Sequence, residues 1–265
     1  MNLGWHITSK KHTAEWLCTA VEDVIQARAP DALGLSEIFE IDADSEVATV
    51  RKQNLLEMIL GRLNSEDSAA QPVWMGRWDI HSIFIWKMHL KLVDAELVSC
   101  SITGQDWRKA QYLRFHPAEA EFPIHVFHTH SPSSGKRVLK LETKKFVPRN
   151  LWNHSLQCHR VFLRKRRGAA QLAEPTVMFI GDYNYDMLEW TTCLAGLNLS
   201  LSSRRSVQYV IAKIGHANKS SPKRGDTAVA INSQIFQERV PSGSVKAMAL
   251  SKFSDGHALS VSLAY

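Results

Sequence analysis

The chain has 265 residues, of which 45% are hydrophobic, and it carries a formal net charge of +6 at pH 7. This length and apolar content suffice for one large core, so we expect a single domain that spans residues 1–265. No stretch approaches the roughly 20 apolar residues of a membrane helix, and the first residues lack the apolar core of a secretory signal. These absences favour an intracellular protein, nuclear or cytoplasmic, or a chain whose start has been trimmed.

The four cysteines are scattered along the chain, at positions 18, 100, 158 and 193, with no C-x-x-C pair. This spacing argues against both a disulfide framework and a cysteine-ligated zinc site. We expect free, buried thiols.

The first third of the sequence alternates strand and helix patterns. Residues 3–7 are typical of a short strand, and apolar residues at helical spacing predict helices over residues 13–28 and 45–63. The segment "DALGLSEIF" between the two helices predicts a strand.

The middle of the chain is rich in short β patterns with alternating polarity, which predicts neighbouring and largely antiparallel strands. A charged helical stretch follows from about Arg137 to Arg167, then a buried strand at Thr176 and a short helix over residues 187–194. We therefore expect one α/β domain of two β layers with helices packed outside. The β patterns are "SIFIWKMHLKLV", "AELVSCSI", "QYLRFH", "IHVFHTH", "SVQYVIAKI", "DTAVAI" and "ALSVSLA".

The segment "TVMFIGDYNYDM" contains an apolar run that ends abruptly in polar residues. Positions 177–180 are all apolar, which is typical of a fully buried strand, and Gly181 ends the run. Asp182 and Asn184 then fall on one side of the extended chain. Asp, Asn and Gly are also ordinary turn residues, so a simple turn is the alternative interpretation.

Other polar residues stand at the ends of predicted strands in the same way. Glu37 lies in an apolar context, where a carboxylate needs a metal, a cation or hydrogen bonds as compensation. Each of these residues alone also has an ordinary structural explanation. The remaining members of the set are His128, His130, Asp226, Asp255 and His257.

Taken in order, these segments resemble the motifs of the endonuclease/exonuclease/phosphatase superfamily, which has the deoxyribonuclease I-like fold. The resemblance extends over nearly the whole chain, and G-D-x-N after a buried strand is its most specific part. It implies a four-layer α/β sandwich and metal-dependent cleavage of phosphate esters. The matching segments are "GWHI", "LGLSEI", "HTHSPSS", "GDYN", "GDTAVAI" and "SDGHALSVSL".

The resemblance implies a role for each matching residue. Glu37 would bind Mg²⁺ or Mn²⁺, since a hard cation that retains several waters needs few carboxylate ligands, and His6 would lie beside it. Asp182 would orient the attacking water, while Asn184 and His130 would contact the phosphate. Proton transfer would fall to the pair Asp255 and His257, and Asp226 would help to position the histidine or the metal shell.

The sequence departs from the family pattern at three positions. His6 replaces an asparagine, and its nitrogen suits Mn²⁺ or Zn²⁺ better than Mg²⁺. Gly256 separates Asp255 from His257, where the family has the two adjacent, so only a β-bulge would return His257 to the site. His128 replaces the asparagine of N-T-H, a milder change because both side chains donate and accept hydrogen bonds.

We expect a monomeric nuclease, with DNA as the favoured nucleic acid. Nucleic acid is favoured over small phosphate esters because residues 159–168, "HRVFLRKRRG", hold five Arg or Lys residues. A solvated helix end is the alternative interpretation of this basic run. Two other functions stay open, a member of the fold that binds without catalysis and a phosphatase or phosphodiesterase for small esters. A weaker hypothesis is zinc, with ligands drawn from His128, His130, His154, Cys158 and His159.

Overall fold

The computed structural model describes the helices, the strands and some of the segments that join them. Glu37 is outside the described residues, as are several other predicted site residues considered below. The described residues are 13–36, 38, 46–65, 73–79, 82–99, 109–120, 123–130, 137–140, 145–166, 176–182, 189, 192–193, 195, 209–215, 227–232, 246–249 and 257–260.

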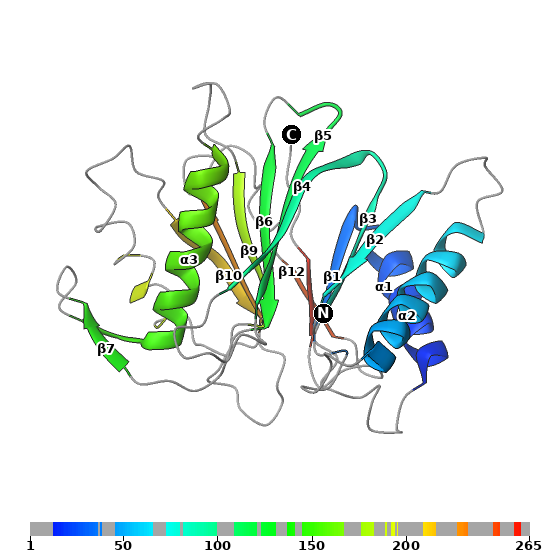
Figure 1. Cartoon of the computed structure of the whole chain (residues 1–265), viewed down its shortest axis with the longest axis horizontal. Helices are drawn as coiled ribbons and strands as arrows, with labels where there is room; N and C mark the ends of the chain where they lie inside the picture. The colour runs from blue at the N-terminus through cyan, green and yellow to red at the C-terminus, as the bar shows by residue number, and fades with distance from the viewer. Residues whose placement is uncertain are drawn as a thin grey trace.

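A three-stranded antiparallel sheet with two helices forms one side of the molecule (Figure 1). Its strand order is β1-β3-β2, with β3 in the centre. Helix α1 begins after Thr13, whose side-chain oxygen accepts a hydrogen bond from the backbone N–H of Trp16 at 3.2 Å. The elements are α1 (Ala14–Arg28), β1 (Ala32–Ser36), α2 (Glu46–Ser65), β2 (Trp74–Trp78) and β3 (Ser82–Lys87).

A six-stranded mixed sheet forms the other side, in the order β10-β11-β9-β6-β5-β4. Its neighbouring strands are antiparallel except β6 and β9, which run parallel at its centre. The strands are β4 (Leu90–Val98), β5 (Ala110–Pro117), β6 (Ile124–His130), β9 (Thr176–Asp182), β10 (Tyr209–Gly215) and β11 (Thr227–Asn232).

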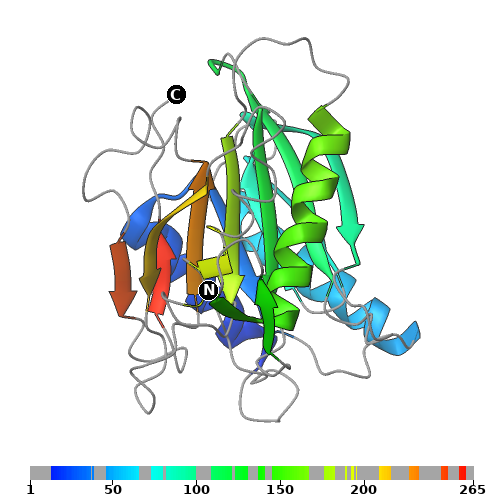
Figure 2. The same ribbon diagram turned by 90° about the vertical axis from the view of Figure 1, so that its left-hand side faces the viewer.

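Helix α3 (Arg149–Arg166) covers the outer face of the six-stranded sheet, while α1 and α2 lie outside the three-stranded sheet (Figures 1 and 2). The result is a sandwich of four layers, helix, sheet, sheet and helix, which confirms the predicted fold class. Two antiparallel strand pairs complete the described part of the chain, namely β7 (Arg137–Lys140) with β8 (Lys145–Pro148) and β12 (Lys246–Ala249) with β13 (His257–Ser260).

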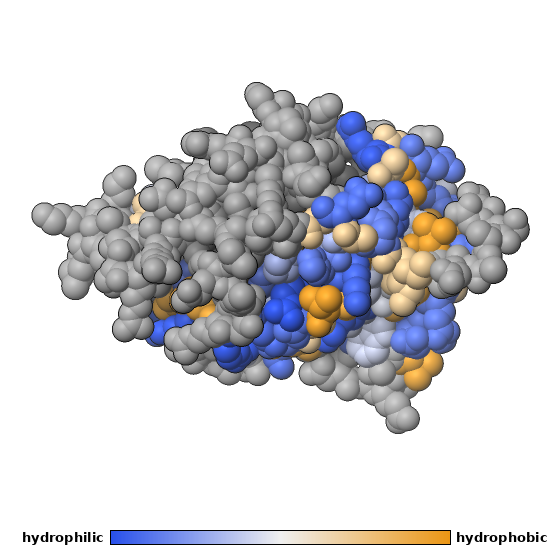
Figure 3. Space-filling model, turned by 90° about the horizontal axis from the view of Figure 1, so that it is seen from above, coloured by the Kyte–Doolittle hydropathy of each residue, from blue (hydrophilic) through white to orange (hydrophobic). Residues whose placement is uncertain are grey.

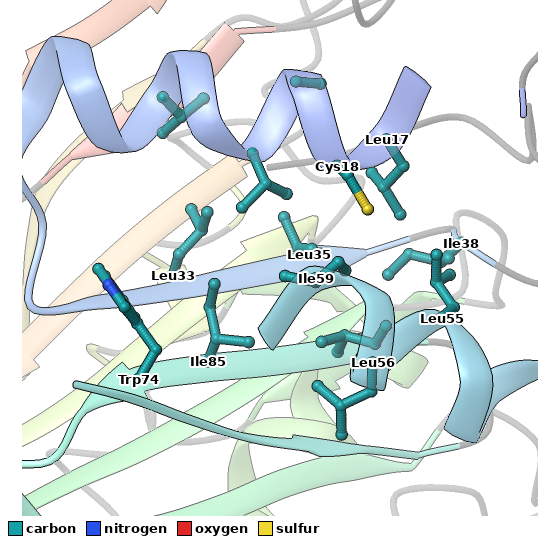
Figure 4. Close-up of a cluster of buried hydrophobic side chains, with 14 residues drawn as sticks. Leu17, Cys18, Leu33, Leu35, Ile38, Leu55, Leu56, Ile59, Trp74 and Ile85 are labelled. Carbon is teal, nitrogen blue, oxygen red and sulfur yellow. The ribbon is translucent and has the colours of Figure 1, made fainter. Parts of the chain in front are cut away.

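Two apolar clusters stabilise these layers. In Figure 4, Leu17 and Cys18 of α1 face Leu33 and Leu35 of β1, with Leu55, Leu56 and Ile59 of α2 on the other side of the cluster. The second cluster lies between the sheets. It joins Phe84 and Trp86 of β3 to Leu113, Phe115, Val126 and Met178 of the six-stranded sheet. Burial of each such side chain contributes roughly 1.5–3 kcal/mol. The first cluster therefore holds α1 and α2 on the three-stranded sheet, and the second holds the two sheets together.

Part of the predicted secondary structure is wrong. The helix expected from Arg137 begins only at Arg149, because β-branched and aromatic residues on either side of position 141 pair as β7 and β8, and Pro148 ends β8. Strands β2 and β12 also lie outside the predicted β patterns. In β2, Gly76 packs so closely that an added Cβ would lie 2.6 Å from Leu56 Cδ1. The strand predicted over residues 3–7 lies outside the described residues.

Three of the four cysteines, Cys18, Cys158 and Cys193, are free and buried, as expected, and Cys100 lies outside the described residues. Burial raises the pKa of the Cys18 thiol, an effect that the nearby Glu22 carboxylate reinforces. No helix among the described residues is long and apolar enough to cross a membrane.

The view from above shows the hydropathy of one face (Figure 3). Its described apolar residues form separate patches between hydrophilic ones. Scattered exposed apolar side chains are normal on a protein surface. Large apolar side chains that are exposed include Val50, Met75, Met88, Val93 and Leu97.

Candidate active site at the ends of β6, β9 and β11

Two predicted catalytic positions are neighbours in the six-stranded sheet. His130 at the end of β6 is the register partner of Asp182 at the end of β9. Hydrogen-bonded strands lie roughly 4.8 Å apart, so these two backbone positions are adjacent. On the other side of β9, Asp182 is paired with Thr227, the first residue of β11. Asp226 precedes Thr227 in the chain and lies outside the described residues. The ends of three strands therefore converge on Asp182.

The glycine of the G-D-x-N motif has a conformational role. Gly181 is buried and has a φ of 133°, a backbone conformation that residues with a Cβ rarely adopt. It lies immediately before Asp182 and is the register partner of Thr129. Strand β9 stays paired with β6 through Gly181 up to Asp182. Gly181 and Asp182 are therefore part of the strand and do not form a simple turn.

Gly181→Ala is expected to lower the free energy of unfolding by about 1–3 kcal/mol, because alanine is strained at this φ. Urea unfolding of the variant measures the change. Gly61→Ala is the control, since an added Cβ in α2 has no atom within 4 Å and alanine favours a helix. If Gly181→Ala matches the control in stability, the glycine conformation has no importance for the fold.

The end of β1 is attached to β6 across the interface between the sheets. Ser36 is the last residue of β1, and its Oγ lies 3.1 Å from Nε2 of His128 in a buried hydrogen bond. Both residues are only 1% exposed. Glu37, the predicted metal ligand, follows Ser36 directly in the chain and lies outside the described residues.

A buried polar layer surrounds this contact between the two sheets. Gln111 of β5 is the register partner of His128, and its Nε2 donates to the backbone carbonyl of Ser82 at 3.4 Å. Ser82 is the register partner of Ser36 and donates from its backbone N and its Oγ to Asp79 Oδ1, each at 2.9 Å. We define the buried polar layer as Ser36, Asp79, Ser82, Gln111 and His128.

Sequence reasoning missed four members of this layer and treated His128 only as a substituted motif residue. A signal was present at one of these positions, because Ser36 is a polar residue at the end of the otherwise apolar strand β1. The contact of Ser36 with His128 depends on how the two sheets pack, and the pairing of His128 with Gln111 depends on the register of β5 and β6. Only the tertiary structure supplies that information.

Other predicted site residues are described in part or not at all. His257 is the first residue of β13, with Ala249 of β12 as its register partner. The β-bulge at Gly256, which would return His257 to the site, therefore stays a prediction. His6, Glu37, Asn184, Asp226 and Asp255 lie outside the described residues.

The zinc hypothesis gains no support from the described part of the chain. His128 contacts β1 and β3 on the inner face of the six-stranded sheet, whereas His154 and Cys158 belong to α3 on its outer face. Within the described ranges, no three His, Cys, Asp or Glu residues form a group that could hold a metal ion. His128 and the residues of α3 that this hypothesis combined are therefore on opposite faces of one sheet.

The basic run at the end of α3 is partly neutralised. Lys165 Nζ lies 2.9 Å from Asp94 Oδ2 and 2.9 Å from Glu96 Oε2, and Arg164 is also paired with Glu96. These hydrogen bonds raise the pKa of Lys165. Burial opposes ionisation of Asp94, but the contact with Lys165 holds its pKa below the ordinary value. Both carboxylates belong to β4, the edge strand three places from β9.

Solved structures of other proteins are similar to this chain in fold, at low sequence identity. No protein-family model matches the sequence, and no curated protein matches it. A mannosyl-6-phosphatase from Bacteroides thetaiotaomicron superposes with a TM-score of 0.60 at 11% identity, covering 97% of this chain and 94% of that one.

Two structures of eukaryotic proteins are also similar to the chain in fold, at equally low sequence identity. D. rerio TDP2 in complex with a single-strand DNA product gives a TM-score of 0.56 at 13% identity, covering 97% of this chain and 94% of that one. The catalytic domain of human Nocturnin with a bound sulfate gives 0.55 at 13% identity, with coverages of 97% and 88%. The chain therefore has the deoxyribonuclease I-like fold of endonuclease/exonuclease/phosphatase proteins.

Proposed function

We propose that the chain is a divalent-metal-dependent phosphoesterase that hydrolyses phosphodiester bonds, with nucleic acid as the first candidate substrate. The observation that supports this most is the register of His130, Asp182 and Thr227 at three adjacent strand ends. The proposal also draws on the similar structures, which include a phosphatase and a TDP2 bound to a DNA product.

The side chains of the proposed ligands, Glu37 and His6, suit Mg²⁺ or Mn²⁺ by their chemistry. The end of β1 is held against β6 through Ser36 and His128, and the next residue in the chain is the carboxylate Glu37. Carboxylate oxygens are the preferred ligands of these cations, and His6 would add a nitrogen that Mn²⁺ accepts more readily than Mg²⁺. A bound cation of this kind stabilises the negative charge that develops on a phosphate during hydrolysis.

In the proposed reaction, the carboxylate of Asp182 accepts a hydrogen bond from the attacking water and orients it in line with the leaving oxygen. Asn184 and His130 hydrogen-bond the phosphate oxygens. As the water oxygen bonds to phosphorus and the bond to the leaving oxygen breaks, His257 would take the proton of the water, while Asp255 and Asp226 would hold its imidazole in place.

A second candidate is a phosphatase or phosphodiesterase for small phosphate esters. It is favoured by the pairing of Arg164 and Lys165 with carboxylates of β4, which removes part of the basic surface that nucleic acid would contact. Binding without catalysis remains the third function on the same fold.

One substrate panel tests these alternatives. Purified protein is incubated with single-stranded DNA, duplex DNA, RNA, a sugar phosphate and an inositol phosphate, each with Mg²⁺, with Mn²⁺ or with EDTA. We expect hydrolysis of nucleic acid with either cation and its loss in EDTA. Glu37→Ala should lose activity, whereas Glu119→Ala should retain it, because Glu119 is an exposed carboxylate in the turn between β5 and β6.

The results separate the candidates. Hydrolysis of only the small esters favours the second candidate. No hydrolysis with either cation, together with salt-sensitive DNA binding, favours the third. Full activity in Glu37→Ala would contradict the proposed metal ligand.

A further inference from the structure

We infer that His128 and Ser36 are positioning residues that set the distance between the metal ligand Glu37 and the catalytic ends of β6 and β9. The inference rests on the proposed function and adds two residues that do not themselves touch the substrate. The observation that carries it is the buried hydrogen bond between Ser36 Oγ and His128 Nε2 at 3.1 Å.

The surroundings of His128 leave its imidazole little freedom. A Cβ added at Gly34 of β1 would lie 2.7 Å from both Cδ2 and Nε2 of the ring, so β1 approaches the imidazole closely. Phe84 of β3 meets the ring edge-to-face, with centroids 5.5 Å apart and an interplanar angle of 60°. The imidazole is thus held by two strands of the opposite sheet.

The sequence positions of the two partners make this contact relevant to the site. Ser36 is one residue before Glu37, and His128 is two residues before His130 on β6. Through the register of β6 and β9, His130 is in turn the neighbour of Asp182. A single buried hydrogen bond therefore connects the chain segment of the proposed metal ligand to that of the proposed catalytic groups.

The reach of the side chain explains why histidine is used here. The bond to Ser36 uses Nε2, the ring atom far from the backbone, and the amide of a glutamine reaches about as far. An asparagine amide is shorter and should lose the bond. The geometry consequently predicts that His128→Gln keeps the function of the contact and that His128→Asn does not.

Strand β6 also carries a matched control on the other face of its sheet. Tyr112 of β5 donates or accepts a hydrogen bond with His125 Nδ1 of β6 at 2.8 Å, and the two residues are 0% and 2% exposed. Burial raises the pKa of Tyr112 well above its usual range. His125 also packs edge-to-face on Phe162 of α3, so this bond faces away from β1.

The test measures Mn²⁺ affinity by titration calorimetry without substrate, and kcat and KM on the best substrate of the panel. We expect Ser36→Ala and His128→Asn to weaken Mn²⁺ binding by about 10-fold and to lower kcat by about 10–100-fold, with KM changed little. His128→Gln should stay within a few-fold of the wild type. Tyr112→Phe should lower the melting temperature but leave Mn²⁺ affinity unchanged.

The possible failures are distinguishable. If the wild type neither binds Mn²⁺ nor hydrolyses any substrate, the proposed function and the inference are both wrong. If the wild type binds Mn²⁺ and Glu37→Ala abolishes binding, but Ser36→Ala and His128→Asn bind normally, only the inference is wrong. An equal loss of Mn²⁺ affinity in Tyr112→Phe would mean that the effect reflects general stability, which also overturns the inference.

Discussion

Asp182→Asn is expected to lower kcat for phosphoester hydrolysis on the order of 10³-fold, because a neutral amide orients the attacking water far less effectively than a carboxylate. The substitution preserves the size of the side chain, and the position is fixed by register partners on both sides of β9. Initial rates at saturating substrate, with Mg²⁺ or Mn²⁺ present, measure the change. The melting temperature should stay near that of the wild type.

Asp94→Asn is the matched control for this substitution. Asp94 is on the edge strand β4 and pairs with Lys165, and such a surface ion pair contributes at most about 1 kcal/mol to stability. Its replacement should leave kcat within about two-fold of the wild type. Comparable losses in both variants, or more than a tenth of the activity left in Asp182→Asn, would contradict the assignment of Asp182.

The second large effect concerns stability in acid. His159 of α3 is 2% exposed, and burial lowers its pKa from 6.5 to about 4. Below pH 6.5 the unfolded chain takes up a proton at this residue that the folded chain does not. The free energy of unfolding should therefore fall by about 3 kcal/mol as the pH drops from about 6.5 to about 4, and this contribution is fully present above pH 6.5.

Urea unfolding at intervals between pH 7 and pH 4.5 measures this dependence. His159→Leu removes the titrating group and keeps an apolar contact with Phe162, so its stability should fall less steeply over the same range. His116→Gln is the control, because His116 is exposed on β5. An identical slope in the wild type and His159→Leu would show that other groups cause the loss of stability in acid.

The sequence predicted most of the fold through periodicity. Helix α1 and the greater part of α2 follow from apolar residues at helical spacing, and β5, β6 and β9 follow from short β patterns. The errors fall where local patterns are ambiguous. The segment after Arg137 contains charged residues typical of a helix surface, but its pairing as β7 and β8 depends on contacts between two chain segments.

The candidate site was predictable only in part. His130 and Asp182 were grouped by motif order, and they are register partners of β6 and β9, while their catalytic roles stay predictions. The basic run was expected to serve a phosphate-rich partner, yet Arg164 and Lys165 pair with carboxylates of β4. The sequence shows the positive charges of α3, but it does not show that α3 packs on β4, whose carboxylates pair with them.

The sequence by itself determined the chemical groups of this protein, most of its helices and strands, and the fold that their motifs resemble. Only the tertiary structure decided that Ser36 meets His128, because a hydrogen bond between residues 92 positions apart depends on the packing of two sheets. It also decided the role of Gly181, since a φ of 133° belongs to the backbone that β6 and β9 form together. The amino-acid sequence determines which side chains are present along each strand and helix. The packing of segments far apart in the sequence determines which of these side chains are in contact.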